Sequence, residues 1–253
     1  MKKELIFLLL FPLAVGLMLV PAPPPGHADD DDDDGDELLY DRAEIFIEFN
    51  DTDQDVGIQV LLDGEPWKKV KAFNPDGDKI LDIRTKRSLK QQGLSELFFE
   101  SSEPSLAEVS LEEFLDRFPP GEYEFEGKTI DGEEIEAEAL FTHVIPAGAE
   151  IVSPACFGDD PPVVDPDSLV IEWEPVTTTL CGSPDIEIVG YQVVVEQEEP
   201  LRVFSIDLPA AATSVTVPAE FFTQPDTVHK FEILAVEMGG NQTITAGEFV
   251  TLP

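Results

Sequence analysis

Basic residues are scarce in this chain of 253 residues, which holds 15 lysines and arginines against 53 aspartates and glutamates. The formal net charge of −38 repels nucleic acid and anionic lipid, so we expect no nucleic-acid partner. The sequence also lacks a Gly-x-Ser-x-Gly elbow, a His-x-x-x-His metal spacing and a glycine-rich phosphate loop. We therefore expect a protein that is not an enzyme; because acids are everywhere, a secreted hydrolase with an unrecognised carboxylate site stays open as an alternative.

The N-terminal residues 1–28 have the composition of a signal peptide. Lys2 and Lys3 precede an apolar run over residues 5–20, and the small residues Gly26 and Ala28 suit cleavage after Ala28. The alternative is an uncleaved membrane anchor, but the run is shorter than the ~20 residues of a spanning helix, so we favour cleavage and expect no membrane insertion after it. The sequence thus predicts an exported protein, periplasmic or extracellular and of bacterial type.

Cysteine is scarce, and the sequence contains two, Cys156 and Cys181. Export permits a disulfide between them, which we favour over two free thiols.

Residues 29–41 contain six consecutive aspartates from residue 29 to residue 34, a composition typical of a disordered acidic segment.

The rest of the chain is rich in strand patterns. Apolar and polar residues alternate from Ala43 to Phe49, and further strands are expected over residues 56–62 and 67–73, joined as a hairpin by a turn at residues 63–66. A second hairpin is expected over residues 122–141. Ser110 and Glu113 form a capping box that predicts one helix over residues 110–118.

Six more strands follow beyond a proline-rich stretch at residues 144–168. Their expected ranges are 168–175, 189–196, 202–208, 213–217, 228–237 and 243–251. Short strands separated by short turns are typical of a β-sandwich. We therefore divide the chain into domains over residues 42–146 and 147–253.

The second domain resembles a fibronectin type III domain. Residues 171–175 (IEWEP) look like its second strand with core residue Trp173, and residues 188–193 (IVGYQV) and 228–236 (VHKFEILAV) look like its third and sixth strands. The family's usual corner tyrosine is replaced by His229, which we interpret as a structural substitute that bonds to nearby backbone. The resemblance implies a module for spacing, adhesion or protein binding.

A weaker resemblance links the first domain to an immunoglobulin-like sandwich. Residues 119–125 (PPGEYEF) look like a tyrosine corner built on Tyr123, followed by a turn at Asp131 and Gly132. The predicted fold class is therefore all-β, with two tandem β-sandwich domains and one short helix in the first.

Two turns carry closely spaced oxygen ligands. Asp51, Asp53 and Asp55 occupy alternate positions, and Asp76 and Asp78 lie in a second turn. The glycine comes one position late for an EF-hand, and no glutamate occupies position 12. Two interpretations stay open: a calcium site, and turns capped by their own Asn and Asp side chains, which we favour. No other cofactor is expected.

Eight of the 15 bases lie between residues 68 and 90. Lysines that guard an edge strand are one interpretation, and a docking patch for an anionic partner is the other. The candidate patch consists of Lys68, Lys69, Lys71, Arg84, Lys86 and Arg87.

Together these features predict an exported, non-catalytic binding or spacer protein that contacts an unidentified protein or cell-surface partner. The alternatives are a calcium-stabilised extracellular scaffold and the hydrolase named above.

Overall fold

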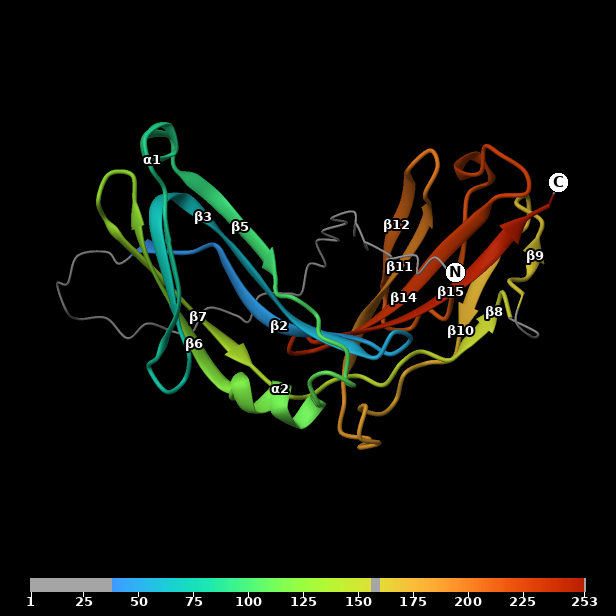
Figure 1. Cartoon of the computed structure of the whole chain (residues 1–253), viewed down its shortest axis with the longest axis horizontal. Coiled ribbons are helices and arrows are strands. Elements are labelled where there is room, and N and C mark those ends of the chain that lie inside the picture. Colours follow the sequence, from blue (N-terminus) through green and yellow to red (C-terminus); the bar gives the residue numbers. More distant parts are fainter. Residues whose placement is uncertain (1–37, 156–159, 253) are drawn as a thin grey trace, which may run out of the picture.

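The computed structural model describes residues 38–155 and 160–252 (Figure 1). The predicted signal peptide, the run of aspartates and Cys156 lie outside these residues. Two β-sandwich modules, each around its own hydrophobic core, make up the described chain. The first core gathers residues between Tyr40 and Ile145, and the second gathers residues between Ala149 and Phe249.

The first module is organised around one long strand, β3 (Asp55–Phe73). Its first part pairs with β2 (Arg42–Asn50) and β5 (Leu94–Glu100). Its second part pairs with β4 (Lys79–Arg84) and β6 (Gly121–Thr129). Because β3 belongs to both sets of strands, it bends around the core that they enclose.

Two further strands complete this module beside β6. Strand β7 (Glu134–Phe141) is antiparallel to β6, and β1 (Leu38–Leu39) is parallel to β7. The predicted hairpin over residues 122–141 is thus confirmed as β6 and β7.

The hairpin predicted across residues 63–66 is wrong. The two flanking segments do not pair with each other, and β3 runs through these residues with a shift of register between Asp63 and Trp67. Gly64 allows a close approach here, since a Cβ atom on it would lie 3.0 Å from Cδ1 of Tyr40. Glycine is common at a bend within a strand as well as in a hairpin turn, so its presence does not distinguish a bent strand from a hairpin.

The expected helix is confirmed as α2 (Leu111–Arg117), in which the Ser110 hydroxyl accepts a hydrogen bond of 3.2 Å from the Glu113 amide. The Phe114 side chain of this helix packs into the first core. The sequence analysis missed β5 and a one-turn helix, α1 (Ser88–Gln92). It also assigned residues 29–41 to a disordered segment, which is wrong for the end of that range, because β1 pairs with β7 and Tyr40 is buried in the first core. None of the helices in the described residues is long and apolar enough to cross a membrane.

The second module packs a three-stranded sheet on a four-stranded one. The first of these sheets contains β8 (Ile151–Ser153), β10 (Val170–Trp173) and β13 (Ser214–Thr216). The four-stranded sheet contains β11 (Ile188–Gln197), β12 (Arg202–Pro209), β14 (Val228–Glu237) and β15 (Gln242–Thr251). All six strands predicted here are present.

Three short elements were not predicted in this module. They are β8, the strand β9 (Val163–Val164), which pairs with β15, and the 3-10 turn η1 (Ala219–Phe221). The strand content and two-sheet packing confirm the all-β sandwich class expected from the sequence.

A single sheet passes from one module into the other. Strand β2 pairs in parallel with β15, with Glu48 opposite Gln242 and Asn50 opposite Ile244. The strand order is therefore β5, β3, β2, β15, β14, β11, β12. Figure 1 shows the two modules opening away from each other on either side of this joint.

Candidate functional site

Asn241, just before β15, joins the two modules through its side chain. Its Oδ1 accepts a hydrogen bond of 2.7 Å from the Ile47 amide on β2. Its Nδ2 donates to the backbone oxygens of Thr142 (3.1 Å) and Val144 (3.0 Å) and lies 2.9 Å from the Thr142 hydroxyl. The side chain is 1% exposed, so these bonds form away from water.

The turn between β2 and β3 also reaches the second module. The Asp51 amide donates to the Ile244 carbonyl at 2.9 Å, and the Thr52 hydroxyl accepts from the Ala246 amide at 2.8 Å. Asn50 closes the turn, because its Oδ1 accepts from the amides of Thr52 and Asp53, each at 3.0 Å. This turn therefore contributes hydrogen bonds between the two modules, and the Asn50 side chain caps it.

The connection between the modules is fixed in the same region. The Thr243 hydroxyl donates to the Pro146 carbonyl at 2.7 Å, and the Leu180 amide donates to the Ile145 carbonyl at 2.9 Å. Gly148 passes directly beside Asp51, where a Cβ atom would overlap the carboxylate. These contacts make the joint an ordered interface and not a loose linker.

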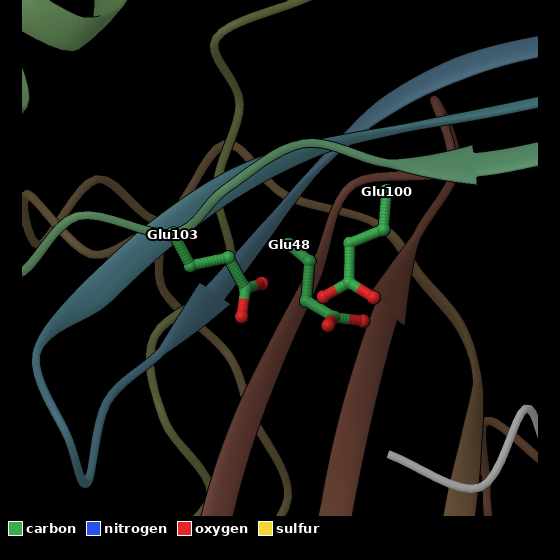
Figure 2. A group of neighbouring side chains, drawn as sticks. All are labelled: Glu48, Glu100 and Glu103. Atoms are coloured by element: carbon green, nitrogen blue, oxygen red, sulfur yellow. The ribbon is translucent and has the colours of Figure 1, made fainter. Parts of the chain in front are cut away.

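Three glutamates converge beside this interface (Figure 2). Glu48 comes from β2, Glu100 ends β5 and Glu103 lies just after it. Each offers a carboxylate oxygen within 4.8 Å of the others. Within residues 38–155 and 160–252, this is the group of three acidic, histidine or cysteine side chains that comes close enough to share a metal ion.

The surroundings of Glu48 and Glu103 disfavour the charged forms of these two side chains. Burial, followed by the charge of Glu100, raises the pKa of Glu48 to about 8. Burial, followed by the charges of Glu48 and Glu100, raises the pKa of Glu103 to about 9. The Gln242 side chain donates a hydrogen bond to Glu48 from the second module and partly offsets this effect.

The pKa values of two nearby acids, Asp55 and Glu232, are raised as well. Burial raises the pKa of Asp55 to about 6, with the Asp53 charge as the second cause. On β14, burial and the Glu196 charge raise the pKa of Glu232 to about 7. The joint therefore holds a set of carboxylates from both modules that repel one another.

The predicted calcium ligands lie in two separate turns. Asp51, Asp53 and Asp55 belong to the turn against β15, and none of them is in the glutamate group. Asp76 and Asp78 lie between β3 and β4, where their amides donate to Oδ1 of Asn74 at 3.1 and 2.8 Å. Both turns use an asparagine cap, and calcium binding stays a prediction.

Three of the six members of the candidate basic patch form contacts within the first module. Lys71 forms an ion pair with Glu126 at 2.6 Å, and Arg84 pairs with Asp82 at 2.9 Å. Lys68 donates to the Ile130 carbonyl at 3.1 Å. Of the other members, Lys69 lies beside them on β3, while Lys86 and Arg87 precede α1. A docking role for this surface stays a prediction.

The predicted corner residues lie in both cores. The Tyr123 hydroxyl donates to the Pro119 carbonyl at 3.1 Å, four residues upstream. His229 Nδ1 lies 3.0 Å from the Thr227 carbonyl and must donate the proton, since a carbonyl only accepts. Burial lowers the pKa of His229, and its ring stacks on Phe249 at 5.1 Å. Trp173 packs against Tyr191, with 5.3 Å between ring centroids.

The predicted disulfide lies partly outside the described residues. Cys181 is exposed in the segment between β10 and β11, and Cys156 is not described. The disulfide stays a prediction.

The sequence analysis did not identify the joint residues. Alternation along the strand places Glu48 on the face opposite the apolar residues but does not show what approaches that face, and no local pattern assigned Asn241 a role between the modules. One usable hint was Gly57 inside a strand, a position typical of close approach. A Cβ atom there would lie 2.8 Å from Cγ of Glu103, so the glycine lets this glutamate cross β3 toward Glu48.

No known protein family matches the sequence, and no curated protein matches it. Solved structures similar to the chain include two fibronectin type III domains of chicken tenascin, with 10% identity, a TM-score of 0.31, and coverage of 83% of this chain and 98% of that one. Another is the FN1–FN3 segment of chicken CNTN1, with 12% identity, a TM-score of 0.32, and coverage of 86% and 68%. The strand order of the chain itself shows two tandem β-sandwich modules.

Proposed function

We propose that this chain is an exported, non-catalytic binding or spacer protein whose two modules are held at a fixed angle. The supporting observation is the sheet that runs through the joint without a break, from β2 into β15. Tandem modules joined by a simple linker reorient freely, because few contacts cross the boundary. Here both backbone and side-chain hydrogen bonds cross it. A fixed angle suits a protein that presents surfaces on both modules to one partner.

The proposal can be tested by measuring the distance between the modules with spin labels. Suitable label sites are Leu89 in the first module and Leu201 in the second, which are 50% and 63% exposed. The labels would be placed on cysteines at these positions in a background with Cys156→Ser and Cys181→Ser. We expect one narrow distance distribution. A broad distribution would contradict a rigid two-module protein.

A further inference from the structure

A buried histidine, His229 on β14, lies at the edge of the second core and is 1% exposed. Its ring stacks on that of Phe249 on β15, with 5.1 Å between the centroids and 7° between the planes. The ring of Phe222 meets it edge-on at 5.1 Å, and that of Phe221 lies 6.0 Å away. Phe221 ends the 3-10 turn η1, and Phe222 follows it. The histidine therefore connects η1 to two strands of the four-stranded sheet.

Side-chain packing, and not backbone pairing, holds η1 against this sheet. The amides of Phe221 and Phe222 donate to carbonyls three residues earlier, at 2.9 and 3.1 Å, so these backbone hydrogen bonds stay within the turn. Strands β14 and β15, by contrast, are paired with each other over residues 228–236. A segment without such pairing opens at a lower free energy than paired strands do. If this end of the module opens locally, η1 is the element that leaves.

The hydrogen bonds of His229 suit the neutral ring. Its Nδ1 donates to the Thr227 carbonyl at 3.0 Å, which leaves Nε2 as the acceptor nitrogen of the neutral form. Nε2 is buried, and no atom of the described residues forms a hydrogen bond with it. A second proton would bind to Nε2, where it adds a positive charge and a donor among phenylalanine rings. A buried charge without a hydrogen-bond partner is costly, so protonation opposes this packing.

The charged side chains of the surrounding elements point away from the ring. Lys230 on β14 and Glu248 on β15 are directly opposite each other, and by alternation they lie on the other face of the sheet. Glu220 in η1 and Asp226 just before β14 are exposed. Burial accordingly lowers the pKa of His229 below its ordinary value of 6.5, and its hydrogen bond to the backbone offsets only part of this effect.

We propose that His229 is a pH-sensitive contact: when its ring takes up a second proton in mild acid, η1 leaves β14 and β15 and uncovers the phenylalanine rings beneath it. The proposal goes beyond the binding function proposed above and does not depend on it. Phe249 lies seven residues beyond Gln242, about 23 Å along β15 from the pairing that joins the modules. Acid thus exposes an aromatic surface at the far end of the second module while the joint stays closed.

The direction of the pH effect follows from the two states of the ring. In the closed module the pKa of His229 is lowered, and in the open form the ring meets water and has the ordinary value of 6.5. The neutral ring therefore stabilises the closed form above pH 6.5, and this contribution is lost as the pH falls toward the lower value. Within that interval each pH unit shifts the equilibrium up to about tenfold toward the open form.

Overall stability does not isolate this effect. Glu48 and Glu103 have raised pKa values, so their protonation stabilises the folded chain as the pH falls, in the opposite direction to His229. The ring contacts themselves have to be followed.

Nuclear magnetic resonance of the full chain tests the proposal between about pH 7.5 and about pH 4.5. The Cε1 shift of His229 reports its protonation, and cross-relaxation between the rings of Phe222 and Phe249, with centroids 6.1 Å apart, reports whether η1 is closed. We expect this contact to be lost with the same midpoint as the protonation, below pH 6.5. The contact between Trp173 and Tyr191, in the same core, should persist. Protonation without loss of the contact would overturn the proposal, as would a ring that stays neutral until the whole module unfolds.

Two variants separate the protonation of His229 from acid effects elsewhere. In His229→Tyr the ring does not titrate in this range, so the contact between Phe222 and Phe249 should persist down to about pH 4.5. Loss of the contact at the same pH as in the unmodified chain would assign the effect to another group and contradict the proposal. His143→Gln is the matched control, because His143 Nε2 also lies close to a carbonyl, that of Phe118 at 2.8 Å, but in the first module. It should leave the midpoint unchanged. The unmodified chain is titrated as well, so the test stands even if His229→Tyr does not fold.

Discussion

Replacing Asn241 with alanine should lower the free energy of unfolding by about 3 kcal/mol and loosen the joint. The change removes the acceptor of the Ile47 amide and the donor to the Thr142 and Val144 carbonyls. Each buried partner left without a hydrogen bond costs roughly 1–3 kcal/mol, and water entering the cavity offsets part of that loss. Urea unfolding measures the stability, and the spin-label distances measure the loosening.

Asn74 provides a matched control for this variant. It also accepts two backbone hydrogen bonds through Oδ1, but it lies in an exposed turn. Asn74→Ala should cost only about 1 kcal/mol, because water replaces the lost bonds, and it should leave the distances unchanged. If Asn241→Ala cost no more than Asn74→Ala, the joint would not depend on this side chain.

Stability should fall as the pH rises from about 5 to about 9, and Glu48→Gln should weaken that dependence. Glu48 and Glu103 have pKa values of about 8 and 9 in the folded chain, against 4.5 for an ordinary glutamate. Between these values the folded state binds more protons than the unfolded state. The free energy of unfolding then decreases with rising pH, and the stabilising contribution of the protonated groups is lost as the pH passes through the folded pKa values.

At pH 8 we expect Glu48→Gln to raise the free energy of unfolding by at least about 1 kcal/mol, since one pKa unit corresponds to about 1.4 kcal/mol. The glutamine keeps an oxygen that accepts from Gln242. Glu138→Gln, at an exposed position of β7, is the control and should have little effect. A free energy of unfolding that stays level or rises between pH 5 and pH 9 would contradict the burial and mutual repulsion of the joint carboxylates.

The elements with local signals were predictable from the sequence. The capping box at Ser110 and Glu113 marks α2 because both groups act within one turn. The strands of the second module were recognised because their apolar residues alternate and turns separate them. His229 was correctly expected to bond to nearby backbone, since the partner at Thr227 is only two residues away.

The joint could not be predicted in the same way because its contacts are distant in sequence. Ile47 and Asn241 are separated by 194 residues, and no local pattern indicates that β2 pairs with β15. Alternation correctly assigned Glu48 to the face opposite the core. It does not say what else approaches that face, so a buried glutamate and a solvated one have the same pattern.

Hydrogen exchange of two backbone amides tests the central claim, a sheet continuous across the joint, most directly. The Ile47 amide donates to Asn241 and the Asp51 amide donates to Ile244, so both acceptors belong to the other module. If the joint is closed in solution, both amides should exchange as slowly as those of the paired core strands β11 and β14. Exchange as fast as that of exposed turns would show that the modules separate, and would contradict the account.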